Sequence, residues 1–265
     1  MKSETSSIDG FLARRGVRCA GHSPRDHLFL PPNPQPDVLE TLFHLWSDYG
    51  FRVFVRDLLN APEGASITRL SRYPSEEAAA GFLATLSNVG LVEELKDHSF
   101  RPKVGDRSSF GVTLEWYVSQ VLEREFAAPA VWSVRLKDTP SGDYDVLADL
   151  GGDLLYVEVT GAPPKHVSEG HVAAFLERLT TLQPDLAVYM IDTHLRMRDK
   201  LVVLFERILR RFRFVGLENA SLTRFEDECF HLGRRLYVTN THRSLTVCLQ
   251  RCFQHSAPRF FDRKE

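Results

Sequence analysis

The alternation of apolar and polar positions divides the chain into a mainly helical first part and a mixed second part. Apolar residues recur at helical spacing over 37–88, and Ser75 is an N-cap candidate for the last helix of this stretch. Gly90 is a stop signal, and the shorter apolar runs of 91–103 predict a two-stranded ribbon. We therefore expect helices that end in a small hairpin.

Beyond residue 104 the apolar pattern switches between the periods of helices and strands. The expected order is helix, three strands in a meander, helix, strand, helix, strand, helix. The segments are a helix over 110–126, strands over 130–138, 142–150 and 153–161, a helix over 168–182, a strand over 186–194, a basic helix from about 196, a strand over 234–242 and a helix from Ser244. This order predicts an α/β fold with a central sheet.

The first 36 residues of the chain end in a proline-rich run. Four prolines lie within 31–36, and proline cannot donate a backbone hydrogen bond. We expect an extended Pro-rich arm over 1–36, a small mainly helical domain over 37–103, and a mixed α/β domain over 104–265. The charged stretch RPKVGDRSS separates the last two.

Two expected strands of the mixed domain carry acids at the same distance from the turn that joins them. Gly-Gly at 151–152 favours a two-residue hairpin turn, because both positions can take positive φ. Leu150 would then face Asp153. Counting back along the strands places Asp145 opposite Glu158. Opposed like charges destabilise a ladder, so this pair needs a cation or strong partners, and a divalent metal is the natural candidate.

Glu115 supplies a third acid by an independent route. It lies within the apolar stripe of the helix over 110–126 and not on the opposite face, so it is expected to point toward the sheet. The alternatives are pairing with a core arginine or displacement to the rim of the helix.

These acids and the order of the elements resemble the PD-(D/E)XK nuclease superfamily over roughly 105–255. Glu115 matches the helix acid of that family, Asp145 in GDYDVLA matches the first strand acid, and Glu158 in YVEVTG matches the second. The resemblance implies a restriction-endonuclease-like fold, with a mixed sheet core flanked by helices. It also implies metal-dependent cleavage of a phosphodiester.

The resemblance further implies roles for individual residues. Asp145, Glu158 and the backbone carbonyl of Val159 would hold Mg²⁺ or Mn²⁺, which polarises a phosphoryl oxygen and lowers the pKa of an attacking water. Glu115 would position a second ion or a water.

The sequence departs from the family at Thr160, where a lysine is expected. Lys165 from the following loop could reach back, Lys137 from the preceding strand could lean in, or a polar side chain could suffice. Lys137 is the poorer candidate, because a tight turn between the strands would place Leu136 opposite Asp145 and point Lys137 away.

Residues 37–103 resemble a winged helix in their pattern of helices followed by a polar hairpin. The helix in the recognition position, EEAAAGFLATLSNVG, has no Lys or Arg, which argues against entry into a major groove. Domain pairing or dimerisation is the alternative role for this unit.

The charge is unevenly distributed, although the net charge is only -2. Basic residues concentrate in the run RMRDKLVVLFERILRRFRF, which can supply phosphate contacts. Nucleic-acid contacts are predicted for Arg196, Arg198, Lys200, Arg210 and Arg211. The alternative is the solvated face of an amphipathic helix, because the interleaved apolar residues have helical spacing.

Cysteines and hydrophobic runs bear on the cellular compartment. The four cysteines do not form a convincing disulfide framework in a chain of this length, and Cys248 and Cys252 are expected to be buried on one helix face. No run is long and apolar enough to cross a bilayer, and the polar start MKSETSSIDG lacks the apolar core of a secretory signal. We expect a cytoplasmic protein with no membrane partner.

The leading hypothesis is a divalent-metal-dependent endonuclease that acts on DNA, with its first domain helping to dock the substrate or a partner. One alternative is a nuclease fold that binds nucleic acid or assembles without turnover, as Thr160 would permit. A second alternative is a winged-helix regulator whose other domain senses a ligand. A homodimer is expected from the resemblance alone.

Overall fold

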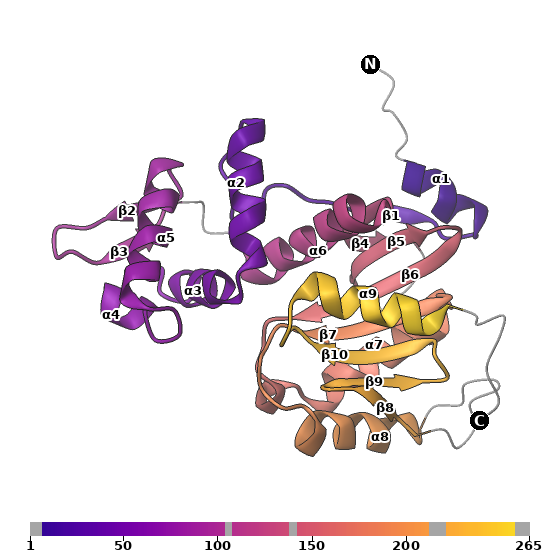
Figure 1. Ribbon diagram of the computed structural model, residues 1–265. Coiled ribbons are helices and arrows are strands. Elements are labelled where there is room, and N and C mark those ends of the chain that lie inside the picture. Colours follow the sequence, from indigo (N-terminus) through magenta and orange to yellow (C-terminus); the bar gives the residue numbers. More distant parts are fainter. Residues whose placement is uncertain (1–6, 104–107, 138–141, 212–220, 258–265) are drawn as a thin grey trace.

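The computed structural model is organised around one eight-stranded mixed sheet with helices on both faces (Figure 1). It describes residues 7–103, 108–137, 142–211 and 221–257. The order across the sheet is β1-β4-β5-β6-β7-β10-β9-β8. The strands are β1 (Cys19–Gly21), β4 (Ala130–Leu136), β5 (Tyr144–Leu150), β6 (Asp153–Thr160), β7 (Leu186–Ile191), β8 (Thr223–Glu226), β9 (Cys229–Leu232) and β10 (Leu236–Asn240). The expected α/β architecture, a mixed sheet flanked by helices, is confirmed.

The connections within the sheet follow most of the expected element order. Strands β4, β5 and β6 form the antiparallel meander, and β6, β7 and β10 run parallel to one another. Helices α7 (Glu169–Leu182) and α8 (Val203–Leu209) lie in the connections that parallel strands require. Strands β8 and β9 are not among the predicted elements, and they extend the sheet in antiparallel pairing beyond β10.

Each face of the sheet is covered by its own hydrophobic cluster. One cluster joins α6 (Phe110–Phe126) and α9 (Leu245–Ser256) to alternate strand residues such as Val146 and Val157. The other joins α7 and α8 to the intervening strand residues, such as Leu147 and Tyr156. This division follows from the alternation of side chains along a strand.

The start of the chain is not extended throughout, in contrast to the arm expected over 1–36. Helix α1 (Ser7–Arg14) packs Ile8, Phe11 and Leu12 into the cluster on the α7 face, and β1 pairs antiparallel with β4. The spacing of these three apolar residues is helical, but the stretch is short and the dense prolines that follow favour an extended arm. The proline-rich stretch itself is irregular as far as the start of α2.

The expected helical unit is present between this arm and α6. It consists of α2 (Pro36–Ser47), α3 (Tyr49–Leu59), α4 (Ile67–Leu70), α5 (Glu76–Asn88) and the paired strands β2 (Val92–Glu94) and β3 (Phe100–Pro102). Ser75 caps α5, since its side chain accepts a hydrogen bond from the backbone N–H of Ala78 at 3.1 Å. The apolar core of the unit is continuous with α6 and with one face of the sheet.

A buried ion pair fixes α3 against the carboxyl end of β7. The guanidinium of Arg52 donates from Nε and from a terminal nitrogen to the two oxygens of Asp192, each at 2.9 Å. Its other terminal nitrogen donates to the carbonyl of Trp46 at 2.7 Å. The two charged side chains are only 1% and 2% exposed. Arg56, one turn further along α3, donates to the carbonyl of Gly161 at 3.1 Å.

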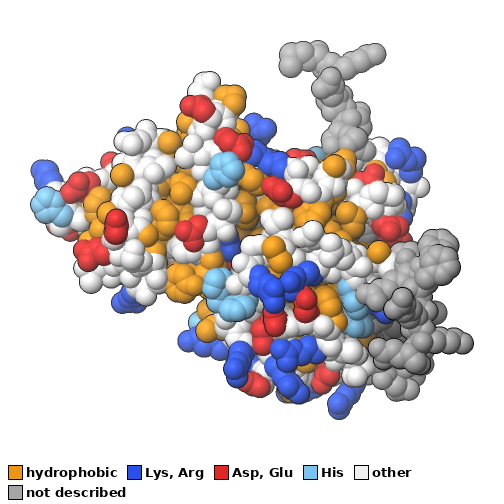
Figure 2. Space-filling model, in the orientation of Figure 1, with side chains coloured by type: hydrophobic (Ala, Val, Ile, Leu, Met, Phe, Trp, Pro, Cys, Tyr) orange, Lys and Arg blue, Asp and Glu red, His pale blue; other side chains and the backbone are white. Residues whose placement is uncertain are grey.

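No helix among the described ranges is long and apolar enough to cross a bilayer. On the face shown in Figure 2, Lys and Arg side chains gather over the part of the molecule that carries α8 and α9, interleaved with Asp and Glu. That part of this face is therefore mixed in charge and not uniformly basic.

Candidate functional site

The hairpin of β5 and β6 has the predicted register. Gly151 and Gly152 both have positive φ, at 66° and 101°, and Leu150 lies opposite Asp153. The paired positions continue as far as Val146 and Val157, after which the next two positions are Asp145 and Glu158.

The acids lie where the backbone pairing of β5 and β6 gives way to side-chain contacts. Oδ2 of Asp145 accepts a hydrogen bond from the backbone N–H of Val159 at 2.8 Å. Because the N–H and C=O of one strand residue leave the strand on the same side, the carbonyl of Val159 also faces β5. The opening between the strands therefore brings together Asp145, Glu158 and one backbone carbonyl.

Glu158 is held by two partners that the sequence pattern did not predict. Arg178 of α7 donates to Oε1 of Glu158 at 2.5 Å, and the hydroxyl of Tyr156 donates to Oε2. The same hydroxyl accepts from Nε of Arg178 at 2.9 Å. The side chains of Arg178 and Glu158 are 12% and 14% exposed, so this is a largely desolvated ion pair.

Glu115 approaches the site from the opposite face, on α6. Phe110, at the start of the same helix, packs against Gly161 just after the end of β6. A Cβ at Gly161 would lie 2.3 Å from the Phe110 ring, so any larger residue here would force this ring to move. The hydroxyl of Ser133 donates to Oε2 of Glu115. Ser133 has a φ of 47°, a conformation that non-glycine residues rarely adopt and that often occurs at functional sites.

The position of Ser133 corrects the expected pairing of β4 with β5. Val146 pairs with Trp132 and Tyr144 pairs with Val134, so Ser133 is level with Asp145, and not Leu136 as a tight turn would require. The connection from β4 to β5 is longer than a two-residue turn, which shifts the register. Lys137 follows the end of β4 and is exposed.

The three acids share an excess of negative charge. Burial raises the pKa of Asp145 well above its usual range, and Glu158 and Glu115 raise it further. Burial also raises the pKa of Glu115 to about 7; the hydrogen bond from Ser133 opposes this shift, and the charge of Glu158 adds to it. The pKa of Glu158 is raised by burial as well, against the opposing effect of Arg178.

The charge on Arg178 balances only part of this excess. Burial opposes its ionisation, but Glu158 and Tyr156 more than compensate, and its pKa lies above the ordinary arginine value. The oxygen donors of the site match the preference of Mg²⁺, which proteins commonly hold through one or two carboxylates and water. In the described part of the chain, no three His, Cys, Asp or Glu side chains are grouped closely enough to hold a metal ion.

The raised pKa of Glu115 predicts a pH-dependent stability effect. In the folded state the carboxyl binds a proton up to about pH 7, whereas in the unfolded state it is ionised above its ordinary value of 4.5. The contribution of the Glu115 carboxyl to stability is thus fully present below pH 4.5 and is lost as the pH rises through 7. We expect Glu115→Gln to raise the free energy of unfolding at pH 8 by about 3 kcal/mol, and to have no such effect below pH 4.5.

Urea unfolding of the metal-free protein at pH 4, 6 and 8 measures this difference, with Glu125→Gln on an exposed position of the same helix as the control. Glutamine keeps an acceptor for Ser133, so the comparison isolates the charge. If the free energies of unfolding of Glu115→Gln and the wild type differ by the same amount at pH 4 and at pH 8, the pKa of Glu115 is not raised.

Thr160 and Lys165 do not bring a cation to the acids. The hydroxyl oxygen of Thr160 accepts from the backbone N–H of Ala162 at 3.2 Å, within the turn that follows β6. Lys165 lies in the short helical turn Pro164–His166, where its side chain is exposed and its carbonyl accepts from Nζ of Lys200 at 2.6 Å. Arg178 instead contacts one of the acids, Glu158.

A sequence signal for Arg178 does exist. It follows Phe175 by three positions, and Val172, Phe175 and Leu179 form the buried stripe of α7. An arginine at the edge of such a stripe can reach inward while its stem packs on apolar neighbours. Tyr156 precedes Glu158 by two positions and therefore shares its face of β6.

The predicted nucleic-acid residues lie around α8 and are exposed. Arg198 and Lys200 belong to a π-helical turn, Arg198–Val202, that precedes α8, so the basic run is not one regular α-helix. Arg211 lies 3.5 Å from Glu169. Arg196 and Arg210 are also exposed. Arg213, in the same run, falls outside the described residues.

Comparison with known proteins gives information on the fold of this chain and none on its chemistry. No protein-family model and no curated protein sequence matches the chain. Among solved structures, protein VC1899 from Vibrio cholerae is similar, with a TM-score of 0.55 and 13% sequence identity. The match covers 94% of this chain but 62% of VC1899, so the chain spans less than two thirds of that protein's length. With an identity of only 13%, the likeness is one of fold alone. It extends over the helical unit and the sheet, because the match covers 94% of this chain.

Proposed function

We propose that this protein is a divalent-metal-dependent nuclease of the PD-(D/E)XK kind, with a restriction-endonuclease-like core and DNA as its substrate. The observation that supports the proposal is that Glu115, Asp145 and Glu158 are largely buried where the pairing of β5 and β6 ends, and that the charge of Glu158 raises the pKa values of the other two. They come from a helix and two strands in the expected order, and their raised pKa values reflect burial and mutual repulsion that a bound cation would relieve.

Each residue of the site has a role that its environment supports. Asp145, Glu158 and the carbonyl of Val159 would hold Mg²⁺ or Mn²⁺. A bound metal ion would supply Lewis-acid polarisation of the phosphoryl oxygen and a lower pKa for an attacking water. Glu115, with a pKa of about 7, is suited to accept the proton of that water near neutral pH.

In this proposal Arg178 performs the task of the lysine that the family carries at the position of Thr160. Its charge lies against Glu158, from where it can stabilise negative charge on the phosphate during cleavage. A cation supplied by a helix instead of the strand would allow the site to tolerate Thr160.

We expect Arg178→Met to lower the cleavage rate by about 100-fold or more, the usual loss when one charge-stabilising donor is removed. Arg178→Lys is expected to retain part of the rate. Arg207→Met is the matched control, because Arg207 forms an exposed ion pair with Glu169 beside α7. Rates of plasmid nicking under single-turnover conditions measure the effect. A wild-type rate for Arg178→Met would remove Arg178 from the mechanism.

The test of the proposal is direct. Plasmid, linear duplex and single-stranded substrates are incubated with Mg²⁺ or Mn²⁺ and the wild type, Asp145→Ala or Glu158→Ala. Cleavage by the wild type alone supports the proposal. Absence of cleavage under every condition, or equal cleavage by the two variants, rejects it.

The helical unit over 37–103 is proposed to dock the substrate or a partner in the manner of a winged helix, and the exposed basic residues Arg196, Arg198 and Arg210 are proposed to contact phosphates. A homodimer would allow cleavage of both strands of a duplex. Binding of duplex DNA by the full chain, weakened when the three arginines are replaced, supports this part.

The second candidate is a protein of the same fold that binds nucleic acid without cleaving it. Both oxygens of Glu158 are engaged by Arg178 and Tyr156, which competes with a metal for this carboxylate. Tight nucleic-acid binding with no cleavage by the wild type favours this candidate over the first.

A further inference from the structure

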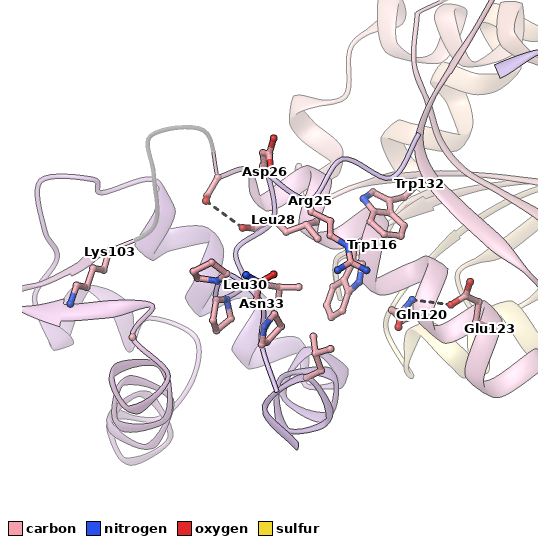
Figure 3. Close-up of a pocket in the computed structure, with 16 residues that line it drawn as sticks. Arg25, Asp26, Leu28, Leu30, Asn33, Lys103, Trp116, Gln120, Glu123 and Trp132 are labelled. Atoms are coloured by element: carbon pink, nitrogen blue, oxygen red, sulfur yellow. Dashed lines mark hydrogen bonds between the residues drawn. The ribbon is translucent and has the colours of Figure 1, made fainter. Parts of the chain in front are cut away.

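A groove of about 1120 Å³ lies on the side of α6 that faces the proline-rich arm (Figure 3). One wall is the arm, including Arg25, Leu30 and Asn33. The other is formed by Trp116 and Gln120 of α6 and by Trp132 of β4. The volume is at the upper end of what ligand-binding clefts enclose, and it is large enough for more than one nucleotide.

The groove contains two of the three tryptophans of the chain. The third, Trp46, is fully buried in the core. Trp132 is partly exposed, and its indole N–H has no hydrogen-bond acceptor among the described residues. Trp116 is 5% exposed and forms the floor beside it. The exposed part of Trp132 is the kind of platform on which bases stack, whatever the sequence.

Arg25 provides a cation at the same place. Its side chain is exposed and has no hydrogen bond or ion pair with any described residue. Figure 3 shows the Arg25 side chain beside Trp116, at the groove. On the other wall, the side-chain amide of Gln120 donates to Glu123 at 3.0 Å, which leaves amide and carboxylate oxygens for hydrogen bonds with base edges or sugar hydroxyls.

The groove is joined to the acidic site by the chain itself. Trp116 follows Glu115 on α6, and Trp132 precedes Ser133 on β4, while Ser133 and Glu115 are hydrogen bonded to each other. Neighbouring residues of α6 and of β4 therefore belong to the groove and to the acidic site.

We propose that this groove binds an unpaired nucleic-acid strand, with a base stacked on Trp132 and a phosphate paired with Arg25. The choice of nucleic acid as the ligand rests on the proposed function. A base can stack on an indole only when its face is free, so a blunt duplex is a poor occupant. The substrate of the acidic site would accordingly carry a single-stranded segment, such as a flap, a gap or a free end.

Binding is measured by fluorescence anisotropy of a labelled oligothymidylate of about 12 nucleotides, and of a blunt duplex of the same length, in EDTA. In the absence of metal no strand is cut, so the result is independent of turnover. The full chain is used as wild type, Trp132→Ala, Trp132→Phe and Arg25→Glu. Arg72→Glu is the matched control, because Arg72 is exposed, has no side-chain partner among the described residues and is not part of the groove.

We expect Trp132→Ala to weaken single-strand binding at least about fivefold, because one stacked base is lost. Trp132→Phe keeps an aromatic face and is expected to bind within about threefold of the wild type. Arg25→Glu weakens binding and lowers the slope of log Kd against log salt by about one, since one phosphate contact is lost. Arg72→Glu and the duplex affinities stay within about twofold of the wild type.

The inference is overturned if the wild type does not bind the single strand. It is also overturned if folded Trp132→Ala and Arg25→Glu bind it as tightly as the wild type, or if the variants lose duplex affinity to the same extent. Arg25 is exposed, so Arg25→Glu remains a fair test even if Trp132→Ala does not fold. Single-strand binding at the groove without any cleavage would refute the nuclease proposal and leave this one standing, and cleavage by a protein with an inert groove would do the reverse.

Discussion

Asp145→Asn is expected to lower metal-dependent cleavage at least about 1000-fold, a loss of about 4 kcal/mol of transition-state stabilisation. The amide oxygen can still accept the hydrogen bond that Val159 donates to Asp145 at 2.8 Å, so the opening between β5 and β6 keeps its shape. Only the negative charge that would hold the metal is removed. Since burial and repulsion from Glu158 raise the pKa of Asp145, the variant should be at least as stable as the wild type near neutral pH.

Asp149→Asn is the matched control. Asp149 lies four positions further along β5, on the same face, and its Oδ1 accepts from the backbone N–H of Gly152 at 2.7 Å. Its replacement is expected to leave cleavage unchanged. Single-turnover rates and urea unfolding curves of both variants give the two quantities. Equal rates for Asp145→Asn and Asp149→Asn would mean that Asp145 does not hold the metal.

Arg52→Met is expected to lower the free energy of unfolding by about 3–5 kcal/mol, the usual effect of leaving one member of a buried ion pair without its partner. Asp192, 2% exposed, would lose both hydrogen bonds from the guanidinium and keep the one that the hydroxyl of Thr241 donates at 2.7 Å. The carbonyls of Trp46 and Ser47 would lose their donor as well. Because folded domains are stable by only about 5–15 kcal/mol, this single change removes a large share.

Urea unfolding at pH 7 measures the loss. Arg101→Met is the control, because Arg101 pairs with Glu93 on the surface and such pairs contribute less than about 1 kcal/mol. The double variant Arg52→Met with Asp192→Asn should recover part of the loss, since no unpaired charge is then buried. A loss below about 1 kcal/mol for Arg52→Met would show that the pair does not fasten α3 to the sheet.

Local signals in the sequence were sufficient to predict the hairpin of β5 and β6. The Gly-Gly turn at 151–152 and the strict alternation on both sides were enough to set the register that places Asp145 next to Glu158, because a two-residue turn leaves one pairing. Glu115 could be identified in the same way from its place in a helical stripe. In each case the information lies within a few residues of the acid.

Contacts between distant segments were not accessible in this way. Arg178 meets Glu158 across 20 residues, and Arg52 meets Asp192 across 140. Both contacts depend on how elements pack, and no spacing rule encodes that packing. The register of β4 was missed for a related reason, because a longer connection leaves several pairings open where a tight turn leaves one.

The short strand β1 protects the sheet at a vulnerable place. It covers the outer edge of β4, where the backbone N–H of Ser23 also donates to the carbonyl of Trp132 at 2.7 Å. A shortened chain that begins after residue 24 would expose a strand edge that includes Val131 and Val134, and such edges recruit further strands from other molecules. Self-association of truncated forms would then begin beside the candidate site, so loss of activity in them would reflect aggregation before it reflected chemistry.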